Sequence, residues 1–187
     1  MAIDLAQTTG PAPADAPSSD FAEAMSALAT GVVMVTNWLD GRPWGMTVSA
    51  FASVSADPPT ILVSLGSETT SARSIEERGS FGVSILGRHH RAAARHGAAR
   101  GASKFLERFT DSRGHGLSPS VGGALAHLDC DVIEVVKVAD HTIFVGRVRD
   151  VRVAAGGEPL VYFRRAYRTL GRLTNPLTRR RIPCPSS

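Results

Sequence analysis

Hydroxyl side chains interrupt a strand-like stretch from Trp44 to Leu65, which reads WGMTVSAFASVSADPPTILVSL. Its alternation predicts β-structure, but a strand that only filled a core would carry valine, isoleucine or phenylalanine at the hydroxyl positions. Thr47 and Ser49 face one way on such a strand, and the residues between and beside them face the other. Hydroxyls and backbone N–H groups on one wall suit a ligand with many acceptors, such as a phosphate.

A second group of hydroxyls, in SLGSETTSAR, stands where a helix is predicted to begin. Thr69, Thr70 and Ser71 lie at its start, and Arg73 lies within its first turn. The free N–H groups of a helix N-terminus bind anions. Ordinary N-capping explains one hydroxyl but not the cluster. We therefore expect an anion site at this helix.

Three histidines fall on the predicted helix RHHRAAARHG, where metal binding is one interpretation. His89 and His96 share a face but lie seven residues apart, and two turns is too far for one metal ion without further ligands. An exposed basic helix face that includes His90 is the favoured interpretation, and we expect no metal.

Two further His–Asp groupings come later in the chain. In AHLDC, His127 and Asp129 point to one face of a strand and Cys130 to the other, which disfavours a Cys–His nucleophilic pair. A polar outer face and a buried cysteine are expected there.

In ADHTIF, Asp140 and His141 stand at the mouth of a predicted hairpin. The histidine either borders a ligand at a barrel rim, or the aspartate stabilises the turn, and the residues alone favour neither.

Bulk properties narrow the class of protein. The chain has 187 residues, 43% hydrophobic and 20% charged, which is ordinary globular composition. No apolar run has the length of a membrane helix, and the N-terminus lacks the pattern of a signal peptide, so we expect no membrane contact.

Cys130 and Cys184 form no metal or disulfide pattern, which favours a cytoplasmic protein with reduced thiols. The pI near 9.7 reflects charge concentrated towards the C-terminus, and without a recognition motif we expect no nucleic-acid binding.

The order of elements predicts a mainly β fold. Residues 1–18 are expected to form a disordered tail, 19–170 the folded domain, and 171–187 a basic tail. Asp20 is expected to cap a helix that ends near Gly31. Six or more mostly antiparallel strands follow, with two or three short helices, a hairpin near 139–140 and a last strand within 158–170. Short turns between sequential strands favour a small barrel with helices packed outside, and no βαβ alternation suggests a doubly wound fold.

Five segments in order resemble the short-chain flavin reductases, the reductase components of two-component, flavin-dependent monooxygenases. They are TGVVMVT, GMTVSAFASVSADPPTILVSL, SIEERGSFGVSIL, GALAHLDCDV with ADHTIFVGRV, and PLVYF, and they cover about residues 20–170. The motifs of phosphate-binding loops, nucleophile elbows and zinc proteases do not occur. The resemblance implies a six-stranded, antiparallel FMN-binding split barrel with short flanking helices.

The resemblance also implies an activity, cofactors and partners. The protein would pass a hydride from NADH or NADPH to FAD or FMN, form a homodimer, and release reduced flavin to a separate monooxygenase. His141 would lie near the nicotinamide as an orienting group rather than an acid or base. The residues placed by resemblance around the flavin are Met46, Thr47, Ser49, Ala50 and Phe51 at the ring and ribityl chain, Ser64, Thr69 and Ser71 at the phosphates, and Tyr167 at the border of the site.

The chain departs from the family pattern in four places. Thr69 and Ser71 stand in the reverse of the usual order of serine and threonine. His90 and His96 replace a usual glutamine and phenylalanine, Ala139 replaces a usual glycine, and the arginine-rich tail is an addition. Other hypotheses are a flavin-binding protein of the same fold without turnover, an oxidase of the pyridoxamine-phosphate oxidase type, and, from the pI alone, a nucleic-acid-binding barrel.

Overall fold

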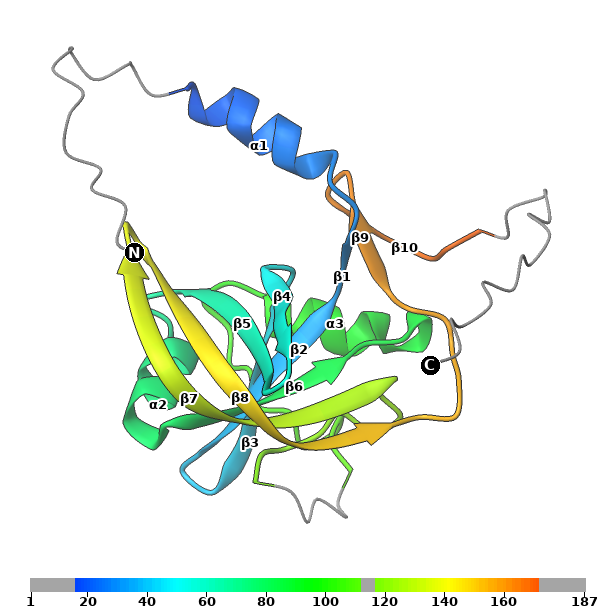
Figure 1. The fold of residues 1–187 in the computed structure, drawn as a ribbon. Helices are drawn as coiled ribbons and strands as arrows, with labels where there is room; N and C mark the ends of the chain where they lie inside the picture. The colour runs from blue at the N-terminus through cyan, green and yellow to red at the C-terminus, as the bar shows by residue number, and fades with distance from the viewer. Residues whose placement is uncertain (1–15, 112–116, 172–187) are drawn as a thin grey trace, which may run out of the picture.

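Strands dominate the computed structural model, which describes residues 16–111 and 117–171 (Figure 1). The strands are β1 (Thr30–Gly31), β2 (Val33–Leu39), β3 (Arg42–Val48), β4 (Phe51–Ala56), β5 (Pro59–Gly66), β6 (Ser80–Ile85), β7 (Ala126–Val138), β8 (His141–Val153), β9 (Val161–Phe163) and β10 (Ala166–Arg168). The helices are α1 (Ser18–Ser26), α2 (Thr70–Arg78) and α3 (Arg91–Ala98), with a 3₁₀ turn η1 (Arg88–His90). Cys184 and most of the two predicted tails lie outside the described residues.

Seven antiparallel strands form one curled sheet in the order β3-β2-β6-β7-β8-β5-β4. β3 and β4 lie at opposite edges, yet only Ser49 and Ala50 separate them in the chain. The sheet must therefore curl until its edges approach, which makes a split barrel and confirms the expected fold. The barrel sheet has seven strands rather than six, because the stretch after Trp44 forms two strands joined by this corner.

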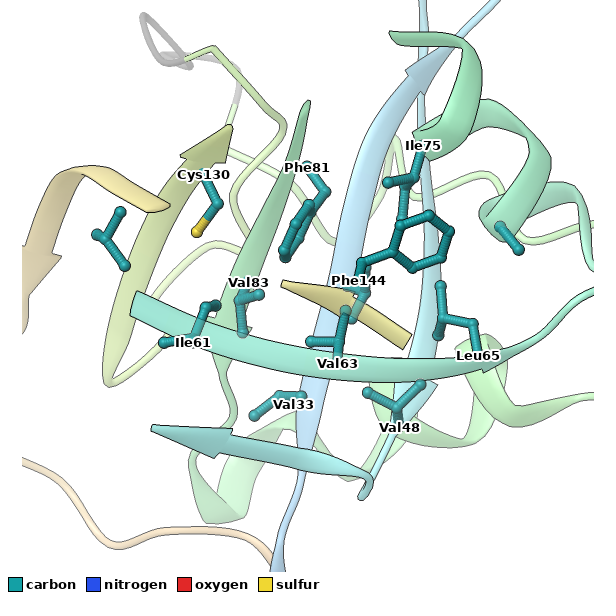
Figure 2. Close-up of a cluster of buried hydrophobic side chains, with 13 residues drawn as sticks. Val33, Val48, Ile61, Val63, Leu65, Ile75, Phe81, Val83, Cys130 and Phe144 are labelled. Atoms are coloured by element: carbon teal, nitrogen blue, oxygen red, sulfur yellow. The ribbon is translucent and has the colours of Figure 1, made fainter. Parts of the chain in front are cut away.

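Alternate residues of six strands fill the barrel interior (Figure 2). Val33, Val63, Phe81, Val83 and Phe144 are almost fully buried there. Helix α2 adds Ala72 and Ile75 to the same core. Burial of each large apolar side chain contributes about 1.5–3 kcal/mol to folding. The alternation that predicted strands thus also selects the face that is buried.

A second, smaller core joins α3 to the outside of β2 and β3. It consists of Val32, Met34, Leu86, Ala93, Ala94, Leu106, Val121 and Leu160. Gly97 allows the close approach, since a Cβ there would overlap the Thr47 hydroxyl and lie 2.8 Å from Met34 Sδ. This core holds α3 against the strand that carries the hydroxyls of interest.

The turns confirm some local predictions and change others. Asp40 and Gly41 both have positive φ, as the predicted Asp-Gly hairpin turn requires. Strands β7 and β8 form the expected hairpin, with Ala139 at φ 51°. The predicted last strand is instead the hairpin β9–β10, which joins β1 in a three-stranded sheet.

Helix α1 differs from its predicted form. It begins at Ser18 after Pro17, without a side-chain cap from Asp20, and it ends at Ser26. Gly31 does not stop it, because β1 pairs with β9 instead. No residue of α1 is buried, and Figure 1 shows the helix extending away from the barrel. No helix in the described ranges is both long and apolar enough to span a membrane.

Candidate functional site

Strand β3 lies at an edge of the sheet, and on its outer side only its first half has backbone hydrogen-bond partners. The Gly45 N–H donates to the Lys104 carbonyl at 3.1 Å, and the Leu106 N–H donates to the Pro43 carbonyl at 2.8 Å. Backbone groups alternate in direction along a strand, so the N–H and C=O of Thr47 point to the same side as those of Gly45. Within the described ranges no segment pairs with β3 at Thr47 on that side. A donor and an acceptor are therefore free to meet a ligand.

Two adjoining cavities lie at this edge, and we call them together the β3-edge groove. One, of about 140 Å³, is lined by Val32, Thr47, Val48, Ser49, Ala98, Tyr162 and Tyr167. The other, of about 370 Å³, is lined by Ala22, Met25, Ser26, Leu28, Thr30, Ser49, Ala50, Tyr162 and Arg165. The groove brings together four predicted site residues, namely Thr47, Ser49, Ala50 and Tyr167. Burial raises the pKa of Tyr167, which keeps its hydroxyl protonated as a donor.

The side chain of Thr47 has a structural partner. Its hydroxyl donates to the Ala94 carbonyl of α3 at 2.8 Å. Thr47 therefore offers a ligand its backbone N–H, while its hydroxyl proton holds α3 to β3. Ser49 is exposed at the corner, and among the described residues its hydroxyl has no hydrogen-bond partner.

Another cavity, of about 310 Å³, lies at the N-terminus of α2. Its lining residues are Trp44, Met46, Thr69, Thr70, Ser71, Gly101, Ala102 and Lys104. Three predicted site residues, Met46, Thr69 and Ser71, thus come together. Lys104 brings a basic side chain to the cavity, and burial lowers the pKa of its ammonium group.

Most hydroxyls at the start of α2 also have structural partners. The Thr69 hydroxyl accepts from the Ala72 N–H at 3.2 Å and donates to the Gly66 carbonyl at 2.8 Å, so Thr69 is the N-cap. The Ser71 hydroxyl is buried and accepts from Trp44 Nε1 at 3.1 Å. Ser71 keeps a proton to donate, and Thr70 is exposed.

The remaining predicted site residues line none of these cavities. The Ser64 N–H donates to the Ala50 carbonyl at 3.0 Å, which ties β5 to the corner. Phe51, the first residue of β4, packs partly against the barrel core. His141 opens β8 opposite Gly66, beside the loop that leads into α2.

His141 is exposed and paired with its neighbour. Its Nδ1 lies 2.7 Å from Asp140 Oδ1, and this hydrogen bond lowers the pKa of Asp140. This hydrogen bond orients the imidazole ring, and among the described residues the Nε2 of His141 has no hydrogen-bond partner. The Asp–His pair stands at the turn of the β7–β8 hairpin, and the proximity of its histidine to a ligand stays a prediction.

The expected polar outer face at AHLDC is a buried network, which corrects that prediction. His127 Nδ1 lies 2.8 Å from Ser84 Oγ, and His127 Nε2 lies 3.1 Å from Ser118 Oγ. Asp129 accepts from the Ser118 N–H and is 1% exposed. The segment beginning at Leu117 covers β6 and β7 there, which sequence alternation cannot reveal. Burial raises the pKa of Cys130 to about 12, so its sulfur stays a thiol rather than a nucleophilic thiolate, and burial lowers the pKa of His127.

The helix histidines also depart from the expected exposed basic face. His90 is buried, where its Nδ1 accepts from the Gly87 N–H and its Nε2 contacts the Gly122 carbonyl at 2.9 Å. His96 Nε2 contacts the Phe105 carbonyl at 2.9 Å. Only His89 of the three is exposed. His90 and His96 fasten neighbouring segments, and within the described ranges no cluster of three potential metal ligands forms.

Sequence reasoning did not identify Tyr162 and Lys104 as site residues. Tyr162 lies in a segment that resembled the family, but its position at both cavities of the β3-edge groove depends on the unpredicted β9–β10 hairpin. Lys104 follows a glycine- and serine-rich connection without periodic signal. Their contacts come from segments distant in sequence.

Comparison with known proteins gives consistent matches. Residues 25–171 match the model of the flavin reductase like domain. The chain is 33% identical over 169 residues to an NADH-dependent flavin reductase of a Rhodococcus species, covering 89% of this chain and 94% of that protein. It is 35% identical over 146 residues to the reductase component of a 4-nitrophenol 4-monooxygenase/4-nitrocatechol 2-monooxygenase of Rhodococcus opacus, covering 78% and 77%.

A solved structure shares the fold. The NADH:FAD oxidoreductase of Streptomyces globisporus, in complex with NAD and FAD fragments, has a TM-score of 0.77 and 26% identity. The similarity covers 84% of this chain and 95% of that chain.

Proposed function

This chain belongs to the flavin reductase like family, and on that premise we propose that it transfers a hydride from a reduced nicotinamide nucleotide to FAD or FMN. The observation that carries the proposal for this chain's own site is the open edge of β3. There the Thr47 N–H and C=O face the β3-edge groove beside Ser49 and Tyr167. A flat ring with an apolar face and a hydrogen-bonding edge fits this wall.

The residues present suit a flavin. Its ring system has an apolar end and a pyrimidine end rich in hydrogen-bond acceptors and N–H groups. Val48 and Tyr167 provide apolar surface, and the backbone of Thr47 provides a donor and an acceptor for the polar end. Ser49 and Ala50 are small, so a ring can approach the backbone at the corner.

The cavity at the start of α2 suits a phosphate. Lys104 supplies a basic side chain, and the N-terminal N–H groups of α2 with the Ser71 hydroxyl supply donors. Met46 lies on the same cavity wall. We assign Thr69 to holding the helix start in place and Ser71 to contact with the phosphate.

The chain's own contribution to the reaction is orientation. A bound flavin supplies the chemistry that accepts two electrons as a hydride. The Thr47 N–H would donate to the pyrimidine edge of a bound flavin, and burial raises the pKa of Tyr167, whose hydroxyl would remain a donor. His141, hydrogen-bonded to Asp140, would act as the orienting group for a nicotinamide. No acid or base is required from the protein.

Steady-state turnover with the four pairings of FAD or FMN with NADH or NADPH tests this function. We expect the purified protein to oxidise NADH only when free flavin is supplied. Absence of NADH and NADPH oxidation with either flavin would overturn the proposal. Tightly bound flavin that NADH fails to reduce would favour the non-catalytic flavin-binding alternative, and hydrogen peroxide formation from pyridoxamine phosphate would favour the oxidase.

Replacing His141 by alanine tests its assigned role. We expect KM for NADH to rise roughly three- to tenfold, the value of one hydrogen bond, while flavin affinity changes less. His89→Ala is the matched control, because His89 is also exposed but lies on η1, whereas His141 opens β8 opposite Gly66. Equal losses of nicotinamide use and flavin affinity in His141→Ala would make the residue structural.

We further propose that reduced flavin passes to a separate monooxygenase. Support comes from the relative in Rhodococcus opacus, which is named as a reductase component. Among the described residues, the cavity beside Thr47 is also lined only by uncharged side chains, which favours release of the product. Addition of a flavin-dependent monooxygenase component should couple NADH oxidation to substrate hydroxylation. Reduced flavin that never leaves the protein would contradict transfer.

We also propose a homodimer, supported by apolar surfaces that the described chain leaves uncovered. The β7–β8 hairpin exposes Ile133, Val135, Val138 and Val151, and α1 exposes Phe21, Met25 and Leu28. In Figure 1 both the hairpin and α1 project beyond the barrel. Such surfaces are typical of interfaces, and a symmetric dimer gives each a partner of the same chemistry.

Sedimentation velocity tests the dimer. We expect a dimer at micromolar concentration and a monomer for Ile133→Asp, because a charge would be buried without a partner. Val54→Asp is the control, since Val54 is equally exposed but lies on β4. A monomeric native protein, or equal effects of the two substitutions, would exclude this interface.

A further inference from the structure

A buried hydroxyl proton at the start of α2 has no acceptor in the described part of the chain. Ser71 lines the cavity there and is 2% exposed. Its oxygen accepts from Trp44 Nε1 at 3.1 Å, and an indole nitrogen can only donate, so the serine proton must go to another atom. A buried donor without an acceptor is costly, and an acceptor that enters the cavity would satisfy it.

Backbone donors of α2 lie at the same end of the helix. Within the described ranges, the N–H groups of Thr70 and Ser71 have no acceptor, because the Thr69 hydroxyl is occupied by the Ala72 N–H. The first N–H groups of a helix together bind anions. The Ser71 hydroxyl adds a side-chain donor to this set. Several donors at one place suit a ligand with several oxygen acceptors, such as a phosphate.

Trp44 fixes the state of this hydroxyl before any ligand binds. Its indole ring is 8% exposed and meets the Phe105 ring edge to face, with centroids 5.0 Å apart and planes at 87°. The Arg42 guanidinium in turn lies 3.6 Å from the Phe105 centroid. This packing holds the indole N–H on Ser71. A hydroxyl that already accepts one hydrogen bond is polarised, and it donates its own proton more strongly.

The hydrogen bond to Ser71 distinguishes Trp44 from an ordinary core residue. A phenylalanine could pack its ring against Phe105, but it has no N–H to donate. Without that donor, the Ser71 hydroxyl is free to rotate its proton away from the cavity. The indole nitrogen therefore sets the direction in which Ser71 donates, whereas the ring sets the packing.

We propose that Trp44 is a positioning residue that fixes the Ser71 hydroxyl as a phosphate donor and thereby makes the protein prefer a phosphate-bearing flavin to riboflavin. This inference rests on the proposed function, which places the flavin ring in the β3-edge groove and its phosphate at the start of α2. FMN and riboflavin share the ring and differ by the phosphate. Their relative affinities therefore report on the phosphate contact alone.

Trp44→Phe removes the N–H and keeps an aromatic ring. We expect the dissociation constant for FMN, measured by flavin fluorescence, to rise about three- to tenfold, the value of one hydrogen bond. The dissociation constant for riboflavin should change little. Trp38→Phe is the matched control, because Trp38 is a half-buried tryptophan on β2 that does not line this cavity. It should alter neither constant, and melting curves check that both variants are folded.

Ser71→Ala completes a double-mutant cycle. Alone it should weaken FMN binding about tenfold or more, since a hydrogen bond to a charged phosphate is lost. In the Ser71→Ala background, Trp44→Phe should have no further effect on FMN, because the two residues act through one hydroxyl. Unchanged FMN affinity in Trp44→Phe, equal losses for FMN and riboflavin, or the same loss without the Ser71 hydroxyl would overturn the positioning role.

Indole N–H resonances test the inference without turnover. The chain has two tryptophans, so Trp38 is an internal reference for Trp44. Titration with inorganic phosphate, against sodium chloride of equal ionic strength, should shift the Trp44 signal in the native protein and not in Ser71→Ala. A Trp44 signal that phosphate leaves in place would overturn the inference even if the protein reduces flavin. A phosphate-dependent shift in a protein that reduces no flavin would support it while the proposed function fails.

Discussion

Replacing Ser49 by leucine should lower kcat/KM for flavin about 10- to 100-fold, which corresponds to about 1.4–2.8 kcal/mol. Ser49 lines both cavities of the β3-edge groove and forms the corner between β3 and β4. A leucine there would occupy the space that the ring system needs beside the Thr47 backbone. Ser49 is exposed, so the change should leave the thermal midpoint almost unchanged.

Ser53→Leu is the matched control. Ser53 is an exposed serine on β4 that lines neither cavity of the groove. Steady-state kinetics with saturating NADH and varied FMN, with melting curves for both variants, distinguish steric exclusion from unfolding. If Ser49→Leu and Ser53→Leu retain equal activity, the flavin does not lie at this corner.

Replacing Gly82 by alanine should lower the free energy of unfolding by about 2–4 kcal/mol. A Cβ at Gly82 would overlap the Ser118 hydroxyl and lie 2.5 Å from Thr36 Oγ1. The Thr36 hydroxyl donates to the Pro119 carbonyl at 2.6 Å, and Ser118 contacts His127 and Asp129. The added methyl group must displace these hydroxyls, which leaves buried polar groups without partners.

Urea unfolding measures this effect, with Gly31→Ala as the control. Gly31 lies on β1 and has open space where its Cβ would stand. Its substitution should change stability by no more than about 0.5 kcal/mol. Equal unfolding midpoints for the two variants would mean that the segment from Leu117 adds no stability over β6 and β7.

Patterns of neighbouring residues in the sequence predicted most of the strands and turns. The sequence patterns of β5, β6, β7 and β8 predicted these strands, because strand periodicity is local. They did not predict which faces are buried, since His127 and Asp129 are buried on the expected outer face of β7. Turn chemistry predicted the Asp40–Gly41 turn, and the ordered motifs predicted the family. Predictions failed where a distant segment set the environment, as at β1, where pairing with β9 overrode the helix stop expected at Gly31.

The sequence by itself determined a mainly β chain with hydroxyls concentrated near β3 and α2, and the resemblance of its ordered motifs indicated the flavin reductases. Only the tertiary structure decided which of those hydroxyl protons and lone pairs a ligand can use. Thr47 donates to Ala94 and Thr69 caps α2, whereas the Thr47 backbone remains open. The tertiary structure also decided that Trp44 and Ser71, 27 positions apart in the chain, share a hydrogen bond. The reason is that hydrogen-bond partners and burial arise from contacts between segments distant in sequence, whereas strand periodicity is local.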